Sequence, residues 1–183
     1  MNVFFRAALL LAVIIALASV GRAAPGDFDV KTDPKCLAKE KSSSGIEKIT
    51  TEQWVYNVTI DNKSARDHAD LDVRYVIYAA DVEPGSKAAP KIIRKRGSTK
   101  VAAIKSHSKT TFTTEPIDLV KTQLSQGVTY GSGARARAND TLEGIRLRIY
   151  KGGEMLAEVA RPPSLTTKEP WEKANDPKAD VKK

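Results

Sequence analysis

Apolar and polar residues alternate along much of the chain after Glu52, which is the pattern of half-buried β-strands rather than of helices. Three segments show the alternation most clearly. Their apolar positions form the predicted core: Trp54, Tyr56, Val58 and Ile60 in the first; Leu71, Val73, Tyr75 and Ile77 in the second; Ile145, Leu147 and Ile149 in the third. The pattern therefore predicts an all-β domain.

Shorter signals between these segments predict further elements. Residues 91–96 and 99–105 flank Gly97-Ser98, which is expected to close a hairpin. Residues 109–117 are rich in Thr and favour another strand. Residues 118–126 are expected to form one or two helical turns.

Three more segments complete the expected set of strands. Residues 28–38 and 128–131 each predict one, and residues 155–160 form a last hairpin with the Ile145 segment across Gly152-Gly153. About seven short strands separated by turn residues predict a two-sheet antiparallel sandwich.

The domain is expected to span residues 24–165, because the composition changes at Thr166. Residues 166–183 are polar and charged, which predicts a disordered tail. Trp171 is the exception in that tail, and it is expected either to fold back onto the domain or to stay exposed to solvent.

The N-terminus has the pattern of a cleavable signal peptide. Arg6 precedes an apolar run over residues 7–20, and the small residues Gly21 and Ala23 predict cleavage after Ala23. The run is too short to span a bilayer core of about 30 Å, so no transmembrane anchor is expected after cleavage. The sequence thus predicts a secreted or periplasmic protein.

The strand order, with an aromatic residue early in the second strand and a Tyr in the third, resembles that of immunoglobulin-like and fibronectin type III-like sandwiches. This resemblance covers residues 28–165 and concerns architecture. Cys36 is the only cysteine, so the disulfide of true immunoglobulin domains is not carried over. The motifs W-x-Y-N-V, D-x-L-x-G-I-R-L-R-I-Y and P-P-S-L also resemble small exported bacterial proteins of unknown function, a likeness that implies no activity.

Composition and motifs limit the kinds of ligand and reaction that the sequence supports. The 183 residues carry a formal net charge of +8, which favours contact with anionic surfaces. His68 and His107 lack the spacing of a zinc site, and the aspartates of residues 61–72 lack the calcium-loop pattern. Gly131-Ser132-Gly133 is not a nucleophile elbow, and nucleotide-binding glycine motifs are absent. We therefore expect no metal and no cofactor.

One set of residues has the composition of a binding surface. The resemblance to an immunoglobulin-like sandwich implies that the second and third segments are neighbouring strands. If their core positions face inward, five side chains then share one outer face: Arg74, Tyr78, Arg146, Arg148 and Tyr150. Arginine and tyrosine engage anionic sugars and carboxylates. The alternative is that Arg stems stacked on Tyr rings only stabilise the sheet.

These observations predict a non-catalytic exported module that binds or scaffolds something in the cell envelope or outside the cell. Its partner is expected to be another protein or an anionic envelope polymer, and not nucleic acid. The alternative is an exported hydrolase whose active site carries no recognisable motif. A cavity with convergent polar residues of shifted pKa would favour the hydrolase.

Overall fold

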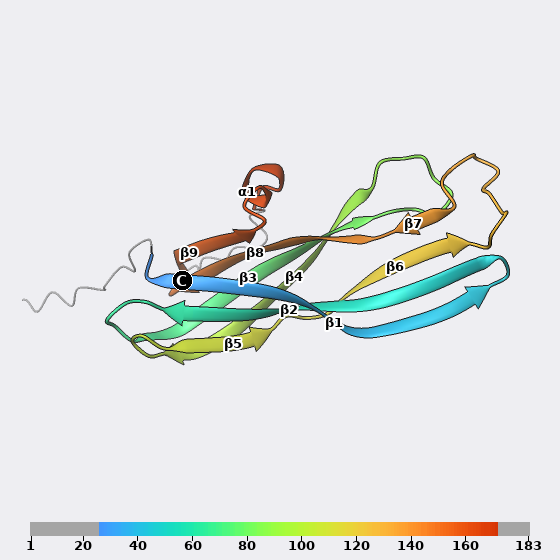
Figure 1. Cartoon of the computed structure of the whole chain (residues 1–183). Helices are drawn as coiled ribbons and strands as arrows, with labels where there is room; N and C mark the ends of the chain where they lie inside the picture. The colour runs from blue at the N-terminus through green and yellow to red at the C-terminus, as the bar shows by residue number, and fades with distance from the viewer. Residues whose placement is uncertain (1–25, 172–183) are drawn as a thin grey trace, which may run out of the picture.

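The computed structural model describes residues 26–171, which form nine strands in two antiparallel sheets (Figure 1). The elements are β1 (Phe28–Ser44), β2 (Glu47–Asn62), β3 (His68–Asp81), β4 (Lys91–Ile104), β5 (Lys109–Thr113), β6 (Ile117–Leu124), β7 (Arg137–Asn139), β8 (Thr141–Lys151), β9 (Glu154–Arg161) and the helix α1 (Leu165–Lys168). The predicted all-β, two-sheet architecture is confirmed, with nine strands instead of about seven. No helix within residues 26–171 has the length and apolarity needed to cross a bilayer.

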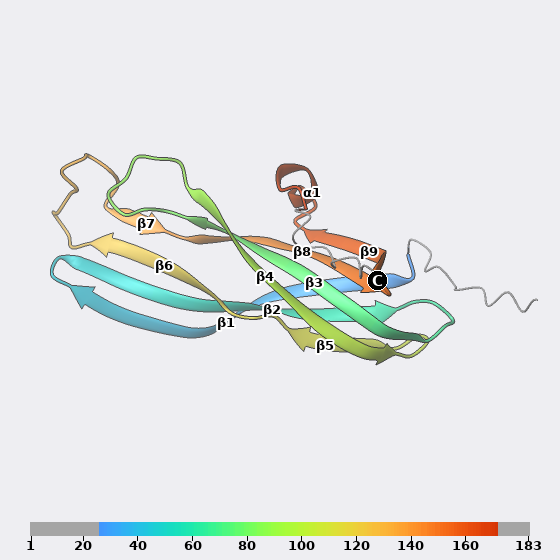
Figure 2. The same cartoon turned by 180° about the vertical axis from the view of Figure 1, so that it is seen from behind.

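The first sheet has the order β1-β2-β6-β7, and β5 also pairs with β2. The second has the order β4-β3-β8-β9, so β3 and β8 are neighbours, as the resemblance implied. The long strand β2 pairs with β5 at its C-terminal end and with β6 at its N-terminal end. As a result the molecule is elongated: β1 and β2 run along its length, with β5 at one end and with β6 and β7 at the other (Figures 1 and 2).

The core lies between the two sheets and contains the predicted residues of all three alternating segments. Val58, Ile60, Leu71 and Ile77 are fully buried, and Trp54 is half-buried against the same cluster. Burying each aliphatic side chain of this size contributes about 1.5–3 kcal/mol, so this cluster is the main source of stability.

Gly97 does not close a hairpin, so this prediction was wrong. Strand β4 runs without interruption past Gly97, which pairs with Tyr75 of β3. A Cβ at position 97 would lie 2.7 Å from the Tyr75 ring atom Cε2. The glycine thus makes room for an aromatic ring across the strand pair, and its presence in the sequence does not signal a turn.

Residues 118–126 and 128–131 also differ from expectation. The segment expected to be helical is mostly strand β6, in which Ile117, Leu119, Thr122 and Leu124 are buried and which pairs with β2. Its lysine, glutamine and leucine residues favour a helix in isolation, but pairing along a sheet overrides that preference. Residues 128–131 form a turn region instead of a strand.

Strand β1 contains a bulge at Leu37, where the pairing with β2 shifts between Cys36 and Ala38. Before the bulge, Lys35 is opposite Val55, on the side of β2 that faces away from Tyr56 and Ile60. After the bulge, Lys39 is opposite Glu52, on the side that β2 shares with the core. The one extra residue moves every later side chain of β1 to the other side of the sheet from the one that regular alternation would give it.

Candidate functional site

The five residues of the predicted binding face do share one face of the second sheet, but that face is largely covered. Arg74 is directly opposite Arg148, and Tyr150 is opposite Asp72. Yet Tyr78 is only 1% exposed, Tyr150 4% and Arg146 6%. Alternation showed which way these side chains point and could not show what lies on top of them.

The cover is the segment that follows β9. Leu165 and Tyr78 belong to one buried cluster, and Trp171 packs against it. Figure 1 shows α1 above β8 and β9. Arg146 Nη1 donates to the Glu169 carbonyl at 2.6 Å, and Arg94 Nη2 donates to the Glu169 carboxylate at 2.6 Å. The first residues of the predicted tail, Thr166–Trp171, therefore belong to the domain surface, whereas residues 172–183 lie outside the described residues.

The arginines of this face are used in contacts within the molecule. Glu158 accepts from Arg146 and, at 3.2 Å, from Arg148. The guanidinium carbons of Arg148 and Arg146 lie 4.5 and 5.7 Å from the centre of the Trp171 ring. Burial raises the pKa of Tyr78, which stays protonated at neutral pH. These contacts support the alternative, in which the Arg and Tyr side chains stabilise the sheet.

Arg74 lies at the rim of the same face. Its Nε donates to Asp72 Oδ2 at 3.0 Å, and its guanidinium carbon lies 5.9 Å from the Tyr150 ring centre. This arginine therefore also stabilises the sheet through a cross-strand aromatic contact.

A close contact between a serine and a histidine lies where the loop after β2 joins β3. Ser64 Oγ is 3.1 Å from His68 Nε2, but it also lies 2.7 Å from Asn62 Oδ1. His68 is buried beside Phe28, and neither Ser64 nor His68 lines the cavities described below. The contact closes a loop, so it does not favour the hydrolase. Within residues 26–171, no group of three or more His, Cys, Asp or Glu side chains could hold a metal ion.

A groove crosses the first sheet where the end of β1 and the start of β2 lie beside β6 and β7. It encloses about 380 Å³, and each of the four strands contributes one cation to its lining: Lys41, Lys48, Lys121 and Arg137. We call these four residues and the space between them the basic groove. Lys41, Lys48 and Arg137 are exposed, and none of these three has an ion-pair partner among the residues that the structure describes.

The bulge at Leu37 is what brings Lys41 into this groove. Lys41 is opposite Thr50, which is opposite Lys121, so these three side chains lie on one side of the sheet. Without the extra residue, Lys41 would share the opposite side with Lys31 and Lys35. Bulges often occur where a strand must redirect side chains beside a functional site.

Glu52 anchors the inner end of the groove. Its carboxylate accepts from Lys39 Nζ and Lys121 Nζ, both at 2.7 Å, and from Trp54 Nε1 at 3.2 Å. Hydrogen bonds from Lys121 and then Lys39 lower the pKa of Glu52 to about 2, although the side chain is 3% exposed. Glu52 thus holds Lys121 in place. On this side of the sheet the carboxylate of Glu52 is accompanied by five cations, Lys39 and the four of the basic groove.

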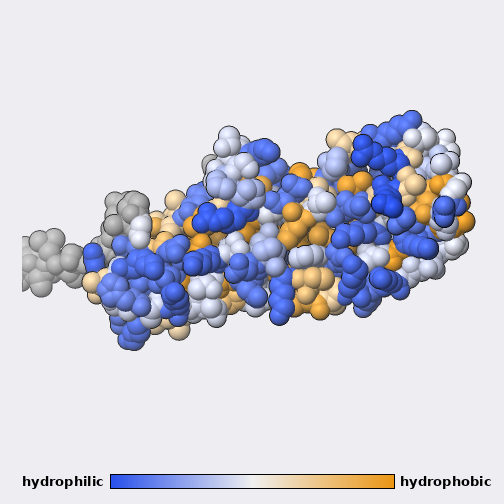
Figure 3. Space-filling view, viewed as in Figure 1, coloured by the Kyte–Doolittle hydropathy of each residue, from blue (hydrophilic) through white to orange (hydrophobic). Residues whose placement is uncertain are grey.

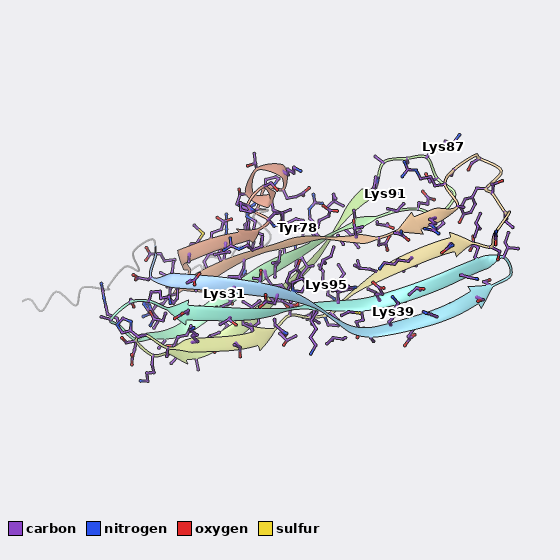
Figure 4. All side chains as sticks on the ribbon, viewed as in Figure 1. Lys31, Lys39, Tyr78, Lys87, Lys91 and Lys95 are labelled. Carbon is purple, nitrogen blue, oxygen red and sulfur yellow. The ribbon has the colours of Figure 1, made fainter. Side chains whose placement is uncertain are left out.

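A second, larger cavity of about 750 Å³ adjoins the groove and shares Arg137 and Asn139 with it. Lys87 and Arg135 add two exposed cations from loops at this end, where Figure 4 labels Lys87. These loops are held together, because Ser132 Oγ donates to the Gly85 carbonyl at 2.7 Å. Hydrophilic side chains cover much of the visible surface of this half of the molecule (Figure 3).

The sequence reasoning missed the basic groove. Lys41 and Lys48 lie outside the segments expected to be strands, Lys121 lies in the segment expected to be helical, and no strand was expected at Arg137. A signal was present in the alternation of cations with small polar residues, K-x-S after residue 40 and K-x-T after residue 47. This alternation predicts that the cation and the polar residue share one side of their own strand. Whether the cations of different strands lie on the same side of the sheet depends on the bulge and on the pairing register.

Replacing Glu52 by Gln is expected to lower the free energy of unfolding by about 1–2 kcal/mol near neutral pH, since both lysine partners are partly solvated. The pKa of Glu52 is about 2 in the folded protein and ordinarily 4.5, so the ionised carboxylate stabilises the fold above about pH 4.5. That contribution is lost as the pH falls from 4.5 towards 2. Urea unfolding of both proteins across this range should show the difference shrink.

The matched control for this prediction is Glu40→Gln. Glu40 is exposed and opposite Thr51, on the other side of the sheet from Glu52. Its replacement should change the free energy of unfolding by less than about 0.5 kcal/mol. A destabilisation by Glu52→Gln that is the same at every pH would contradict the assignment.

Comparisons with known proteins assign no family. No protein-family model matches the chain, and a sequence comparison with curated proteins finds no match. The fold is similar to that of the structural-genomics target SoR45, at 18% identity over 63% of this chain and 83% of that chain, with a TM-score of 0.35. It is also similar to a protein described as ApaA from Bordetella pertussis, at 11% identity over 74% and 89%, with a TM-score of 0.36.

A third likeness is to part of β-glucuronidase 2 from Bacteroides uniformis, at 10% identity over 70% of this chain but 12% of that chain, with a TM-score of 0.31. All three scores are below 0.5. These likenesses therefore assign neither a family nor an activity.

Proposed function

We propose that this protein is a non-catalytic binding module, exported to the periplasm or the exterior of the cell, that takes an anionic envelope polymer on its basic groove. The observation that carries the proposal is the concentration of cations in that groove. Four neighbouring strands each place one there, and the lining contains no carboxylate. Export rests on the signal-peptide pattern of residues 1–23.

The arrangement supports binding better than solubility alone. On a sheet face whose charges only keep the protein soluble, cations are expected to be interspersed with carboxylates. Here a bulge redirects Lys41 towards Lys48, and Glu52 fixes Lys121 close by. Concentrating like charges on one side costs electrostatic free energy, which a bound polyanion would recover.

The proposed relation to immunoglobulin-like and fibronectin type III-like sandwiches is consistent with this role. Its support is the pairing of β3 with β8 at the centre of the second sheet. Such a sandwich positions a binding surface on a rigid frame and needs no catalytic group.

The test compares two double variants, each of which removes two lysine charges. The variant with Lys41→Ser and Lys48→Ser removes two charges from the groove. The variant with Lys31→Ser and Lys35→Ser removes two charges from the side of the sheet that faces away from the groove. We expect the first to weaken binding to an acidic polysaccharide about tenfold, or about 1.4 kcal/mol, and the second to change it less than about twofold. The affinity of the unmodified protein should fall as salt rises.

Both variants should keep their stability within about 0.5 kcal/mol, because all four positions are exposed. Isothermal titration at low and physiological salt supplies the affinities. Equal weakening by the two variants would show that net charge alone attracts the polymer, and the proposal would fail.

A further inference from the structure

The four cations of the basic groove do not form a straight row. Lys41 on β1 and Lys121 on β6 lie in one cross-strand row, and Lys48 on β2 and Arg137 on β7 lie in the next row. Each cation is therefore diagonal to the next, about 7–8 Å away between side-chain positions on adjoining strands. No two of these like charges are directly opposite on neighbouring strands, an arrangement that would destabilise the sheet.

Neutral hydrogen-bonding side chains fill the remaining positions of the same two rows. Thr50 and Asn139 complete the first row, and Ser43 and Gln123 complete the second. All four line the groove together with the cations. Cations and neutral polar side chains thus alternate both along the strands and across them, in a checkerboard pattern. Each cation has hydroxyl or amide groups as its direct neighbours.

The chemistry of this checkerboard selects among polyanions. The side chains of Thr50, Asn139 and Gln123 both donate and accept hydrogen bonds, so they can donate to any anionic oxygen. Their acceptor oxygens, however, find no donor on a polymer that carries only anionic oxygens. A sugar hydroxyl donates and accepts. No aromatic residue lines the groove, so the bases of a single-stranded nucleic acid would find nothing to stack on.

We infer that the ligand of the basic groove is an anionic glycan, a chain of sugars with acidic groups and free hydroxyls, that lies across the four strands from β1 to β7. This inference rests on the proposed function. Three strand spacings make the path about 14 Å long. The acidic groups of the glycan meet Lys41, Lys48, Lys121 and Arg137 in turn, and its hydroxyls meet the side chains between them.

A paired substitution separates hydroxyl recognition from charge. Thr50 and Thr51 are consecutive, and they point to opposite sides of β2. Thr50→Val should weaken the binding of oligogalacturonate about threefold to fivefold, because both the donor and the acceptor of the hydroxyl are lost, and should weaken the binding of inorganic polyphosphate less, because only the donor is lost. Thr51→Val should change neither. Both replacements keep the side-chain shape, and unfolding curves verify that each variant is folded.

Ligand length supplies the second readout. The affinity for galacturonate oligomers should rise steeply until four acidic groups are present and then level off, because the groove offers four cations. Sulfated oligosaccharides of the same length, run in parallel, show whether carboxylate or sulfate is preferred. A neutral oligosaccharide should not bind detectably.

The possible failures are distinguishable. If polyphosphate or polyglutamate binds as tightly as oligogalacturonate and Thr50→Val changes nothing, the glycan inference is overturned while the binding module stands. The same holds if affinity keeps rising in proportion to length. If no polyanion discriminates between the two double lysine variants described above, the proposed function itself fails.

Discussion

Replacing Gly144 by Ala should lower the free energy of unfolding by about 4 kcal/mol, the largest effect expected for adding one methyl group to this protein. Gly144 has a φ of +142°, a backbone conformation that is essentially restricted to glycine. An added Cβ would also collide with the Arg161 carbonyl oxygen and lie 2.7 Å from Pro162 Cδ and 2.8 Å from Leu165 Cδ1. The substitution therefore combines backbone strain with overpacking where the covering segment joins β9.

Gly127→Ala is the matched control for this prediction. Gly127 also has a positive φ, +82°, but no atom lies within 4 Å of the position that its Cβ would occupy. It should therefore cost only the backbone strain, about 1 kcal/mol. Urea unfolding followed by tryptophan fluorescence measures both. A difference of less than about 1 kcal/mol between the two variants would mean that the chain after β9 is not packed against Gly144.

Arg146→Met should lower the free energy of unfolding by about 3 kcal/mol, because it leaves the partly buried Glu158 carboxylate without one of its guanidinium partners. It also removes the donor to the Glu169 carbonyl and one of the two cations beside Trp171. Methionine keeps the length of the apolar stem, so the loss reports mainly on the charged contacts.

Arg137→Met is the control, because Arg137 is exposed and should tolerate the change within about 0.5 kcal/mol. A second readout follows the covering segment itself. In a Trp54→Phe background Trp171 is the only tryptophan, and Arg146→Met should increase its quenching by acrylamide. Unchanged stability together with unchanged quenching would restore the open binding face that the sequence suggested.

Alternation predicted the core of this protein correctly because the pleat of a strand leaves little choice. Once Leu71 and Leu147 are placed inside, the residues two positions away must follow them. The same logic correctly placed Arg74 and Arg148 on one face. It failed on their environment, since a strand pattern carries no information about a segment such as Leu165–Trp171 that packs over the sheet later.

The errors along the strands have different physical causes. Gly97 suggested a turn because glycine often marks one, but here it accommodates the Tyr75 ring within a continuous strand. The basic groove required the cross-strand register of four strands, which depends on the bulge at Leu37. The local sequence predicts which side chains share one side of a single strand. The pairing register of the folded sheet determines which side chains of different strands lie on the same side.

The bulge at Leu37 also affects how molecules of this protein meet one another. Strand β1 ends the order of its sheet, and a long edge strand can template hydrogen bonding with a second molecule. Pro34 supplies no amide donor, and the irregular backbone at Leu37 interrupts the regular ladder that a docking strand would need. The residue that directs Lys41 into the groove therefore also protects the protein against edge-to-edge aggregation at high local concentration.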